Sequence, residues 1–224
     1  MSISFQRAPS SAVETSLVAT EYRSSSEYAE FVQLNSSVSM LHPDALALLY
    51  HLGLHCAGPI LEFGPYIGGS TIAIARGLVA SGASAKITSV ELGEGFTHET
   101  YLTTNIVESL RSNLIKFEVA ERVNLVVGAS NDRRVVSEVS AIVGDSGKFR
   151  CLFIDTDGEV RRDIDLYRDL LAPGCFLVID DYFAPGNRAK EEVTKRDIER
   201  LERGGVIQSF GVYGWGTWFG RFAA

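Results

Sequence analysis

Five short apolar runs, each followed by a helical pattern after a short connection, constrain the fold of this chain most strongly. The runs are nearly continuous rather than alternating, which is typical of strands buried on both faces of a parallel sheet. We predict strands at Ile60–Phe63, Ile87–Glu91, Val123–Val127, Cys151–Asp155 and Phe176–Asp180. Because right-handed crossovers join parallel strands, this alternation predicts a doubly wound, Rossmann-like α/β fold with a sheet between two helical layers.

The expected helices between these strands cover Ser70–Ala80, His98–Ser112, Asp132–Val143 and Val160–Leu171. Pro173-Gly174 is expected to end the last of them, and a charged helix follows over Ala189–Arg203. Two further β runs, Val206–Tyr213 and Thr217–Phe222, are joined by a short turn that contains glycine, which predicts a hairpin. The sheet should therefore close with an antiparallel strand.

The N-terminal quarter of the chain precedes the first predicted strand. Residues 1–23 are rich in Ser, Thr and Ala with little periodicity, which favours a loose segment or an arm that orders on a partner. Helical patterns follow from Ser26 to Val38 and from His42 to Leu52. We therefore expect an N-terminal region, residues 1–55, that acts as a lid or in homo-oligomer contacts, and a sheet domain, residues 56–224.

Charge and hydrophobicity exclude several kinds of partner. The net charge is −7, without a long block of like charges, so a nucleic-acid backbone is not an expected ligand. The N-terminus lacks the basic start and apolar stretch of a leader, and no run approaches the roughly 18 to 20 apolar residues of a membrane span. Cys56, Cys151 and Cys175 lie in apolar runs and predict core thiols. We expect a cytoplasmic protein that acts on small molecules, away from membranes.

A glycine-rich turn joins the first predicted strand to its helix, with the sequence Glu62-Phe63-Gly64-Pro65-Tyr66-Ile67-Gly68-Gly69-Ser70. Glycines let a backbone approach a ligand closely, and a helix start presents free N–H groups, so such turns bind nucleotide-like ligands. The spacing differs from the Gly-x-Gly-x-x-Gly of dinucleotide binders. The Glu62 carboxylate disfavours a pyrophosphate and suits a cationic ligand. We expect the ligand to contact Glu62, Gly64, Tyr66, Gly68, Gly69 and Ser70.

Acidic residues end four of the five predicted parallel strands, at the sheet edge where ligands bind. Glu91 ends the second strand, about 20 residues after the glycine turn, where a carboxylate can accept both hydroxyls of a ribose. Its alternative role is that of a helix-start or surface carboxylate. The loop after the third strand, Gly128-Ala129-Ser130, is expected to line the same site.

Three aspartates form a second constellation. Asp155, Asp180 and Asp181 end neighbouring predicted strands, so their carboxylates can converge on Mg²⁺ or a similar hard cation. Such an ion would hold and acidify a substrate hydroxyl. Each aspartate can instead cap the following helix or begin a loop.

Together these segments resemble class I S-adenosylmethionine-dependent methyltransferases over about residues 55 to 222. The motifs that carry the resemblance are Glu62-x-Gly64-x-x-x-Gly68-Gly69-Ser70, Ser89-Val90-Glu91, Phe153-Ile154-Asp155-x-Asp157, Leu171-x-Pro173-Gly174 and Val178-Ile179-Asp180-Asp181-Tyr182. It implies a seven-stranded, mostly parallel sheet of order 3-2-1-4-5-7-6. It places Glu62, Gly64 and Gly68 at the methionine side of S-adenosyl-L-methionine, and we expect Asp155 to contact this cofactor as well.

A narrower similarity concerns the acceptor side. The segments around Asp155-x-Asp157 and Asp180-Asp181-Tyr182-Phe183, with Pro185 and Arg188 after them, are similar to the branch that contains macrocin-type sugar O-methyltransferases and cephalosporin-pathway enzymes. Enzymes of that branch are often Mg²⁺-dependent. Resemblance to this branch implies a divalent metal at Asp155, Asp180 and Asp181.

The general base is less evident. Catechol-type relatives carry a lysine, and sugar-type relatives often a histidine, at the position of Gly158. Asp157 can replace that base beside Asp155, or a metal can lower the pKa of the hydroxyl until water accepts the proton. A metal-independent enzyme would instead use His42, His51, His55 or His98. Zinc binding by His51 and His55, with Cys56 adjacent, is not expected because further ligands are lacking nearby.

Aromatic residues indicate where an acceptor binds. Tyr182 and Phe183 are expected to contact it, whereas Trp215 and Trp218 can simply cover a sheet edge. The function we expect is O-methylation of a sugar, phenol or natural-product hydroxyl by S-adenosylmethionine with Mg²⁺. Alternatives are N-methylation, a methyltransferase fold that binds the cofactor for other chemistry, and a nucleotide-cofactor oxidoreductase, which the glycine spacing disfavours.

Overall fold

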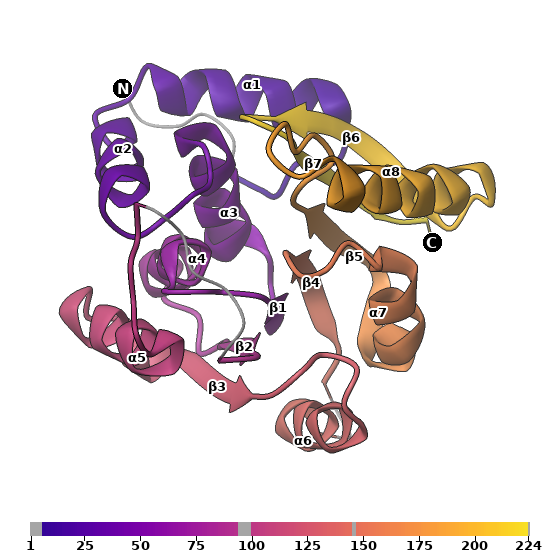
Figure 1. The fold of residues 1–224 in the computed structure, drawn as a ribbon. Helices are drawn as coiled ribbons and strands as arrows, with labels where there is room; N and C mark the ends of the chain where they lie inside the picture. Colours follow the sequence, from indigo (N-terminus) through magenta and orange to yellow (C-terminus); the bar gives the residue numbers. More distant parts are fainter. Residues whose placement is uncertain (1–5, 94–99, 145–146, 224) are drawn as a thin grey trace.

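The computed structural model describes residues 6–93, 100–144 and 147–223, and a seven-stranded sheet of order β3-β2-β1-β4-β5-β7-β6 lies at its centre (Figure 1). The strands are β1 (Ile60–Phe63), β2 (Ile87–Glu91), β3 (Val123–Val127), β4 (Phe149–Ile154), β5 (Leu171–Ile179), β6 (Ile207–Tyr213) and β7 (Thr217–Phe222). The first five are parallel, and β7 is antiparallel to both β5 and β6. The predicted order and the closing hairpin are confirmed.

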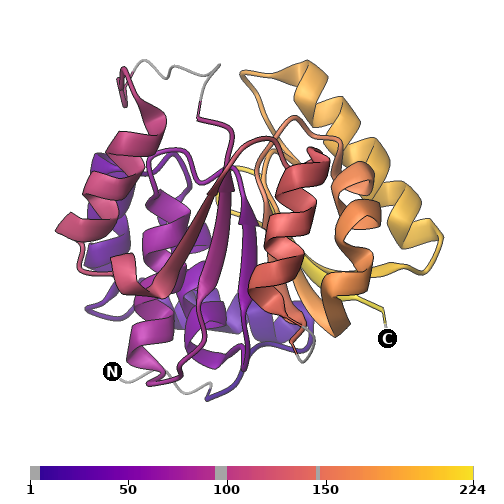
Figure 2. The ribbon, with the colours of Figure 1, turned by 90° about the horizontal axis from the view of Figure 1, so that it is seen from below.

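Helices cover both faces of the sheet (Figure 2). They are α1 (Ala12–Arg23), α2 (Tyr28–Ser37), α3 (Pro43–His55), α4 (Gly69–Ala80), α5 (Ile106–Lys116), α6 (Arg133–Val143), α7 (Val160–Tyr167) and α8 (Arg188–Arg203). Ile60 packs into the core beneath α3 and α4, and its neighbour Leu61 into the core beneath α6 to α8. Both faces of β1 are thus buried, as its unbroken apolar run predicted, and each such side chain stabilises the fold by about 1.5 to 3 kcal/mol. None of the described helices is long and apolar enough to cross a membrane.

The N-terminal helices attach to the sheet domain through a close helix pair. A Cβ at Gly53 of α3 would lie 2.3 Å from the carbonyl oxygen of Ile74, and a Cβ at Gly77 of α4 would lie 2.2 Å from that of Tyr50. These two glycines let the helix axes approach more closely than any side chain would allow. The helix that begins at the glycine turn is thereby fixed against α3.

The expectation of a loose segment over residues 1–23 is wrong for its second half, which forms α1. The Ser11 Oγ caps this helix by accepting the N–H of Glu14 at 3.2 Å, and Ser-x-x-Glu is the capping-box pattern. Val18 and Tyr22, four residues apart, are buried with Thr15 and Ala19. The inward stripe was hard to see in the sequence because Thr and Ala add little to a hydrophobic pattern.

Two other boundaries differ from the prediction. Helix α5 begins at Ile106, because the Asn105 side chain accepts the N–H of Glu108 at 3.0 Å and caps it there; His98 lies outside the described residues. Helix α7 ends at Tyr167 and a short 3₁₀ turn, Arg168–Leu170, leads directly into β5. Pro173-Gly174 therefore lies within β5, beside a register irregularity in its pairing with β4, instead of ending a helix.

Candidate active site

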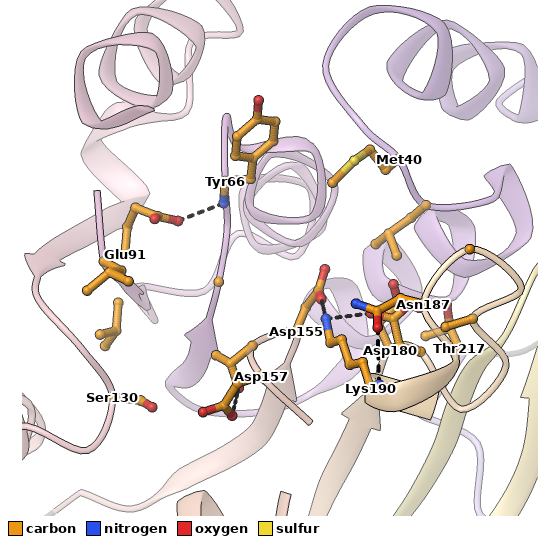
Figure 3. A pocket seen from close by; sticks show the side chains of 18 of the residues that line it. Met40, Tyr66, Glu91, Ser130, Asp155, Asp157, Asp180, Asn187, Lys190 and Thr217 are labelled. Carbon is orange, nitrogen blue, oxygen red and sulfur yellow. Dashed lines mark hydrogen bonds and ion pairs between the residues drawn. The ribbon is translucent and has the colours of Figure 1, made fainter. Parts of the chain in front are cut away.

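A cavity of about 1070 Å³ opens at the carboxyl ends of the parallel strands. On one side it is lined by the glycine-turn half, which we define as Gly64, Tyr66, Glu91 and the loop Gly128–Asn131. On the other side it is lined by the acid-cluster half, which we define as Asp155, Asp180, Asp181, Lys190 and Thr217. Figure 3 shows Glu91 and Tyr66 across the cavity from Asp180 and Lys190, with Asp155 between them.

Glu91 is fixed by backbone groups at the wall of the cavity. One carboxylate oxygen accepts the N–H of Tyr66 at 2.9 Å and the other accepts the N–H of Gly93 at 2.9 Å. Each oxygen keeps a further lone pair for a ligand hydroxyl. Burial raises the pKa of Glu91, an effect that these two N–H bonds oppose. The predicted ribose carboxylate is thus held rigidly where a ligand can reach it.

Glu62 is placed differently from Glu91, although it lies in the neighbouring strand, one residue before the end of β1. It is fully buried and does not line the cavity. Its carboxylate accepts the hydroxyls of Ser70, Thr71 and Ser89 at 2.5 to 2.6 Å. Burial raises the pKa of Glu62, while these three hydroxyl bonds lower it. The arrangement ties β1, β2 and α4 together and leaves no direct path from this carboxylate to the ligand predicted for it.

The glycines of the turn serve different purposes. Gly64 has φ +81°, and a Cβ there would lie 1.8 Å from the carbonyl oxygen of Asp155, so a side chain is excluded at the cavity wall. Gly68 caps α4 with φ +103°, and a Cβ at Gly69 would lie 2.3 Å from the Ser39 Cβ. Gly68, Gly69 and Ser70 lie outside the cavity lining. These three residues, predicted to contact the ligand, instead lie on the side of the turn that faces away from the cavity.

The loop after β3 lines the cavity as predicted, through Gly128, Ala129 and Ser130. The Ser130 hydroxyl donates to the Asp163 carboxylate at 3.0 Å, and the Ser130 carbonyl accepts the Tyr167 hydroxyl at 2.7 Å. These two hydrogen bonds hold the loop against α7 where it lines the cavity. Sequence alone did not indicate this anchor on α7.

The three predicted aspartates come together. One oxygen each from Asp155, Asp180 and Asp181 lies within 4.8 Å of the others. Asp181 has φ +59°, a left-handed conformation that aspartate tolerates better than most residues. The convergence expected from the strand order is therefore present in the acid-cluster half.

Lysine enters this cluster from α8. The Lys190 Nζ donates to the Asp155 Oδ1 at 2.9 Å (Figure 3). It also forms an ion pair with Asp181. Burial lowers the pKa of Lys190, but the two carboxylates outweigh that effect and raise it above its ordinary value. The amine is therefore a permanent ammonium at neutral pH.

This ammonium decides whether the predicted metal fits. A divalent ion bound by carboxylates needs its oxygens at about 2.0 to 2.6 Å and the space between them. That space is held by the Lys190 Nζ, which already bonds two of the three carboxylates. The residues as arranged do not accommodate a divalent ion beside the ammonium.

Asp180 lies at the opposite end of the cluster from α8. Its Oδ1 accepts the Thr217 hydroxyl of β7 at 2.7 Å. Burial and the carboxylates of Asp155 and Asp181 raise the pKa of Asp180 to about 7, against the Thr217 bond. Asp180 is thus the member of the cluster that is bonded to a neutral hydroxyl instead of a cation.

Asp157 is not free to act as the predicted base. Both of its oxygens accept from Arg162, at 2.6 and 3.0 Å. Burial raises the pKa of Asp157, but the guanidinium bonds and the N–H of Glu159 lower it overall. A carboxylate held in a bidentate ion pair is a weak proton acceptor.

Among the described histidines, His42 lines the cavity, whereas His51 and His55 do not. The His42 Nδ1 accepts the N–H of Asp44 at 3.1 Å, so a neutral ring carries its proton on Nε2 and can donate a hydrogen bond to a ligand. Both nitrogens of His51 are bonded, to the Tyr22 hydroxyl and the Arg7 carbonyl. Both ring nitrogens of His51 are therefore used within the protein.

The aromatic residues divide between cavity rim and core. Phe183 is 48% exposed and Trp215 is 60% exposed, and both line the cavity. The Trp215 ring meets that of His42 edge-on at 5.1 Å. Tyr182 lies outside the lining and packs edge-on against Phe183, and Trp218 is buried in the core. Phe183 can therefore contact an acceptor in the cavity, whereas Tyr182 cannot contact it directly.

Sequence reasoning missed several residues that line the cavity, namely Met40, Arg162, Asn187, Lys190 and Thr217. For Lys190 a signal was present. It lies four residues before Thr194 and eight before Ile198, both of which are buried. A lysine on the buried face of a helix is expected to extend its ammonium toward an acidic or polar partner.

Comparison with protein families gives one match to this chain. The family model described as "Methyltransferase domain" matches residues 61–182, more than half of the 224 residues. The matched segment runs from β1 to the residue after the acid pair Asp180-Asp181. No curated protein sequence gave a significant match.

Solved structures share the fold over nearly the whole chain. The O-methyltransferase from Bacillus cereus, in complex with SAH, is 17% identical with a TM-score of 0.62, and the match covers 96% of this chain and 98% of that one. The O-methyltransferase TomG from Streptomyces achromogenes, involved in tomaymycin synthesis and in complex with SAM, is 17% identical with a TM-score of 0.60, covering 93% and 96%. The SAH-bound methyltransferase PaMTH1 from Podospora anserina is 17% identical with a TM-score of 0.56, covering 96% and 89%. At these identities the likeness shows the fold.

Proposed function

Since the chain belongs to the methyltransferase domain family and is an S-adenosylmethionine-dependent methyltransferase, we propose that it methylates a hydroxyl group of a small molecule. The observation that carries the proposal is a single cavity with a ribose-type carboxylate, Glu91, at one side and an aromatic rim and acid cluster at the other. Its volume of about 1070 Å³ is at the upper end of the range for one small ligand. It suits a cofactor and an acceptor together.

The glycine-turn half would hold the cofactor. Glu91 can accept two ribose hydroxyls through the lone pairs that Tyr66 and Gly93 leave free. Gly64 and Gly128 present bare backbone to the cavity, with φ +81° and +146°. When bound, S-adenosylmethionine supplies a methyl group activated by a sulfonium. All three of the solved structures named above contain SAM or SAH, which supports this choice of cofactor.

The acid-cluster half and the rim would hold the acceptor. Phe183 and Trp215 offer exposed aromatic surface beside Asp155 and Lys190, an arrangement that suits a ring with a hydroxyl at its edge. A sugar, phenol or natural-product hydroxyl meets this description, as the resemblance to the macrocin-type and cephalosporin-pathway branch implies. The similar proteins from Bacillus cereus and Streptomyces achromogenes are O-methyltransferases, which supports a hydroxyl acceptor. The Mg²⁺ expected from the sequence does not fit these residues as arranged, because the Lys190 ammonium is bonded to both Asp155 and Asp181.

The proposal is tested by binding and turnover. Isothermal titration of the purified chain should give saturable binding of S-adenosylmethionine and S-adenosylhomocysteine, with NADH as the control ligand. Incubation with methyl-labelled S-adenosylmethionine and a panel of sugars, phenols and amines should then label a hydroxyl-bearing acceptor. Saturable binding of NADH without binding of S-adenosylmethionine would overturn the cofactor, and labelling of amines alone would overturn the hydroxyl acceptor.

A further inference from the structure

We infer that Lys190 is a built-in cation of the active site, taking the place of a divalent metal at Asp155, Asp180 and Asp181, and that its ammonium positions the acceptor hydroxyl. Lys190 of α8 supplies the positive charge that offsets the repulsion among the three converging aspartates. Such a charge is needed because three neighbouring carboxylates repel one another and are costly to bury in their ionised forms unless a cation lies between them.

The contacts of Lys190 are those of a fixed charge. Its side chain is 16% exposed, and its Nζ is bonded to Asp155 and Asp181 at once. Those two carboxylates are themselves only 21% and 27% exposed. An ion pair shielded in this way is far less screened than one on the surface. Lys195, one turn later on α8, instead pairs with Glu191 on its own helix.

The backbone is shaped to bring Lys190 into this position. Gly158 has φ +87°, and a Cβ there would lie 3.1 Å from the carbonyl oxygen of Lys190 and 3.3 Å from its Cγ. Any side chain at residue 158 would thus press on the stem of Lys190. The absence of a side chain at Gly158 thus leaves the space beside Asp155 that Lys190 of α8 occupies.

Lys190 keeps one donor for a ligand. An ammonium has three N–H groups, and in the described part of the chain two are used, by Asp155 and Asp181. Lys190 also lines the cavity, so the third N–H can bond an acceptor oxygen. A neighbouring ammonium favours the ionised form of a hydroxyl, whose proton then passes to water in the cavity. Because Lys190 meets both carboxylates as a hydrogen-bond donor, it acts as a positioning and electrostatic group and not as the base.

The chemical consequence rests on the proposed methyl transfer, but the cation site itself does not. Binding of Mn²⁺ therefore tests the cation site without any acceptor. The full-length chain, freed of metal with EDTA and dialysed, would be titrated with Mn²⁺ by calorimetry, with thermal unfolding as a check of folding. The variants are Lys190→Ala, which vacates the site, Lys190→Arg, which keeps the charge, and Arg200→Ala, which removes an exposed charge of α8 away from the cavity.

We expect the parent, Lys190→Arg and Arg200→Ala to show no saturable Mn²⁺ binding below about 1 mM, and Lys190→Ala to bind Mn²⁺ more tightly than that. Saturable binding by the parent in the same range would show that a metal displaces Lys190 and would overturn the inference. If Lys190→Ala does not fold, the parent and Lys190→Arg titrations still decide between these outcomes.

Activity gives a second readout once an acceptor is identified. The parent should keep its turnover in EDTA, and Lys190→Ala should lose about 100-fold or more in kcat while its affinity for S-adenosylmethionine stays within about twofold, because one fixed donor at a developing charge is removed. Full turnover by Lys190→Ala, or loss of parental turnover in EDTA, would overturn the inference. Failure of the parent to bind S-adenosylmethionine would instead overturn the proposed function and leave the Mn²⁺ result standing.

Discussion

The glycine-turn half lines the cavity with residues at or just after the ends of β1, β2 and β3, whereas the acid-cluster half also draws Lys190 from α8 and Thr217 from β7. Glu91 is held by backbone N–H groups, those of Tyr66 and Gly93. The aspartates of the other half are held by side chains, an ammonium and a hydroxyl. The carboxylate of the first half is therefore held in place by nearby backbone groups. The carboxylates of the second half are held by side chains from other helices and strands.

This difference predicts how each half responds to substitution. A change at a glycine of the glycine-turn half should move backbone and so affect folding as well as binding. A change in the acid-cluster half should alter charge and hydrogen bonding while the backbone stays in place, so turnover should fall with little loss of stability. The substitutions below test this contrast, beginning with the largest expected effect.

Gly64→Ala should be the most damaging. The added Cβ would lie 1.8 Å from the carbonyl oxygen of Asp155, at a φ of +81°, so the alanine both clashes and is strained. We expect a loss of about 4 kcal/mol in the free energy of unfolding, measured by urea denaturation. Gly82→Ala is the matched control, because Gly82 has φ +68° with open space around it. It should cost only about 1 kcal/mol. Equal losses in both variants would show that the clash with β4 is unimportant.

Glu62→Gln should lower stability without changing cofactor affinity. In glutamine an amide nitrogen replaces one of the two oxygens that accept the hydroxyls of Ser70, Thr71 and Ser89. This nitrogen cannot accept the hydroxyl bonded at its position and places a second donor against it, so we expect a loss of about 3 kcal/mol in the free energy of unfolding. Burial raises the pKa of Glu62, so its stabilisation is full below the unfolded pKa and is lost as pH rises through the folded one. The deficit should therefore be largest in acid and shrink as the pH rises.

The cofactor titration of Glu62→Gln also tests the sequence assignment. Weaker binding of S-adenosylmethionine at unchanged stability would place Glu62 at the ligand after all. Glu108→Gln, an exposed change on α5, is the control for both measurements.

Glu91→Ala should weaken cofactor binding by about 1 to 3 kcal/mol, the scale of a lost hydrogen bond to a charged group. The carboxylate lies at the cavity wall with lone pairs free for a ribose. Calorimetry with S-adenosylhomocysteine measures the effect, and Glu91→Gln, which keeps part of the acceptor capacity, should lose less. Unchanged affinity in both variants would contradict the ribose assignment.

Most of the fold could be predicted from the sequence, because buried parallel strands leave an unbroken apolar signal. The runs at Ile60–Phe63 and Ile87–Glu91 became strands with the predicted bounds. Helix α1 was missed because its inward positions include Thr15 and Ala19, which are weakly apolar. The start of β5 was missed because Pro173 and Gly174 are commoner in turns, and here an irregular pairing with β4 accommodates them.

The site was predictable only where local sequence determines it. A carboxylate at the end of a strand, such as Glu91 or Asp155, is placed by strand position alone. Whether that carboxylate faces the cavity depends on its neighbours, and the hydroxyls of α4 turn Glu62 away from the cavity. Lys190 lies 35 residues after Asp155, so its contact depends on how α8 packs, which the local sequence around the aspartates does not determine.

Thr217→Val should have the smallest effect, confined to the acid-cluster half. It removes the hydroxyl that donates to Asp180 at 2.7 Å while nearly keeping the side-chain volume. Loss of one such bond costs about 1 kcal/mol, so we expect kcat to fall about fivefold while the affinity for S-adenosylmethionine is unchanged. Thr194→Val on α8 is the matched control, because Thr194 is also buried but its hydroxyl has no hydrogen-bond partner among the described residues. It should leave kcat unchanged and be neutral or stabilising toward thermal unfolding. A fall in cofactor affinity in Thr217→Val would show that the two halves are coupled through Asp155, which lies between them, and that the acid cluster cannot be altered independently of the glycine turn.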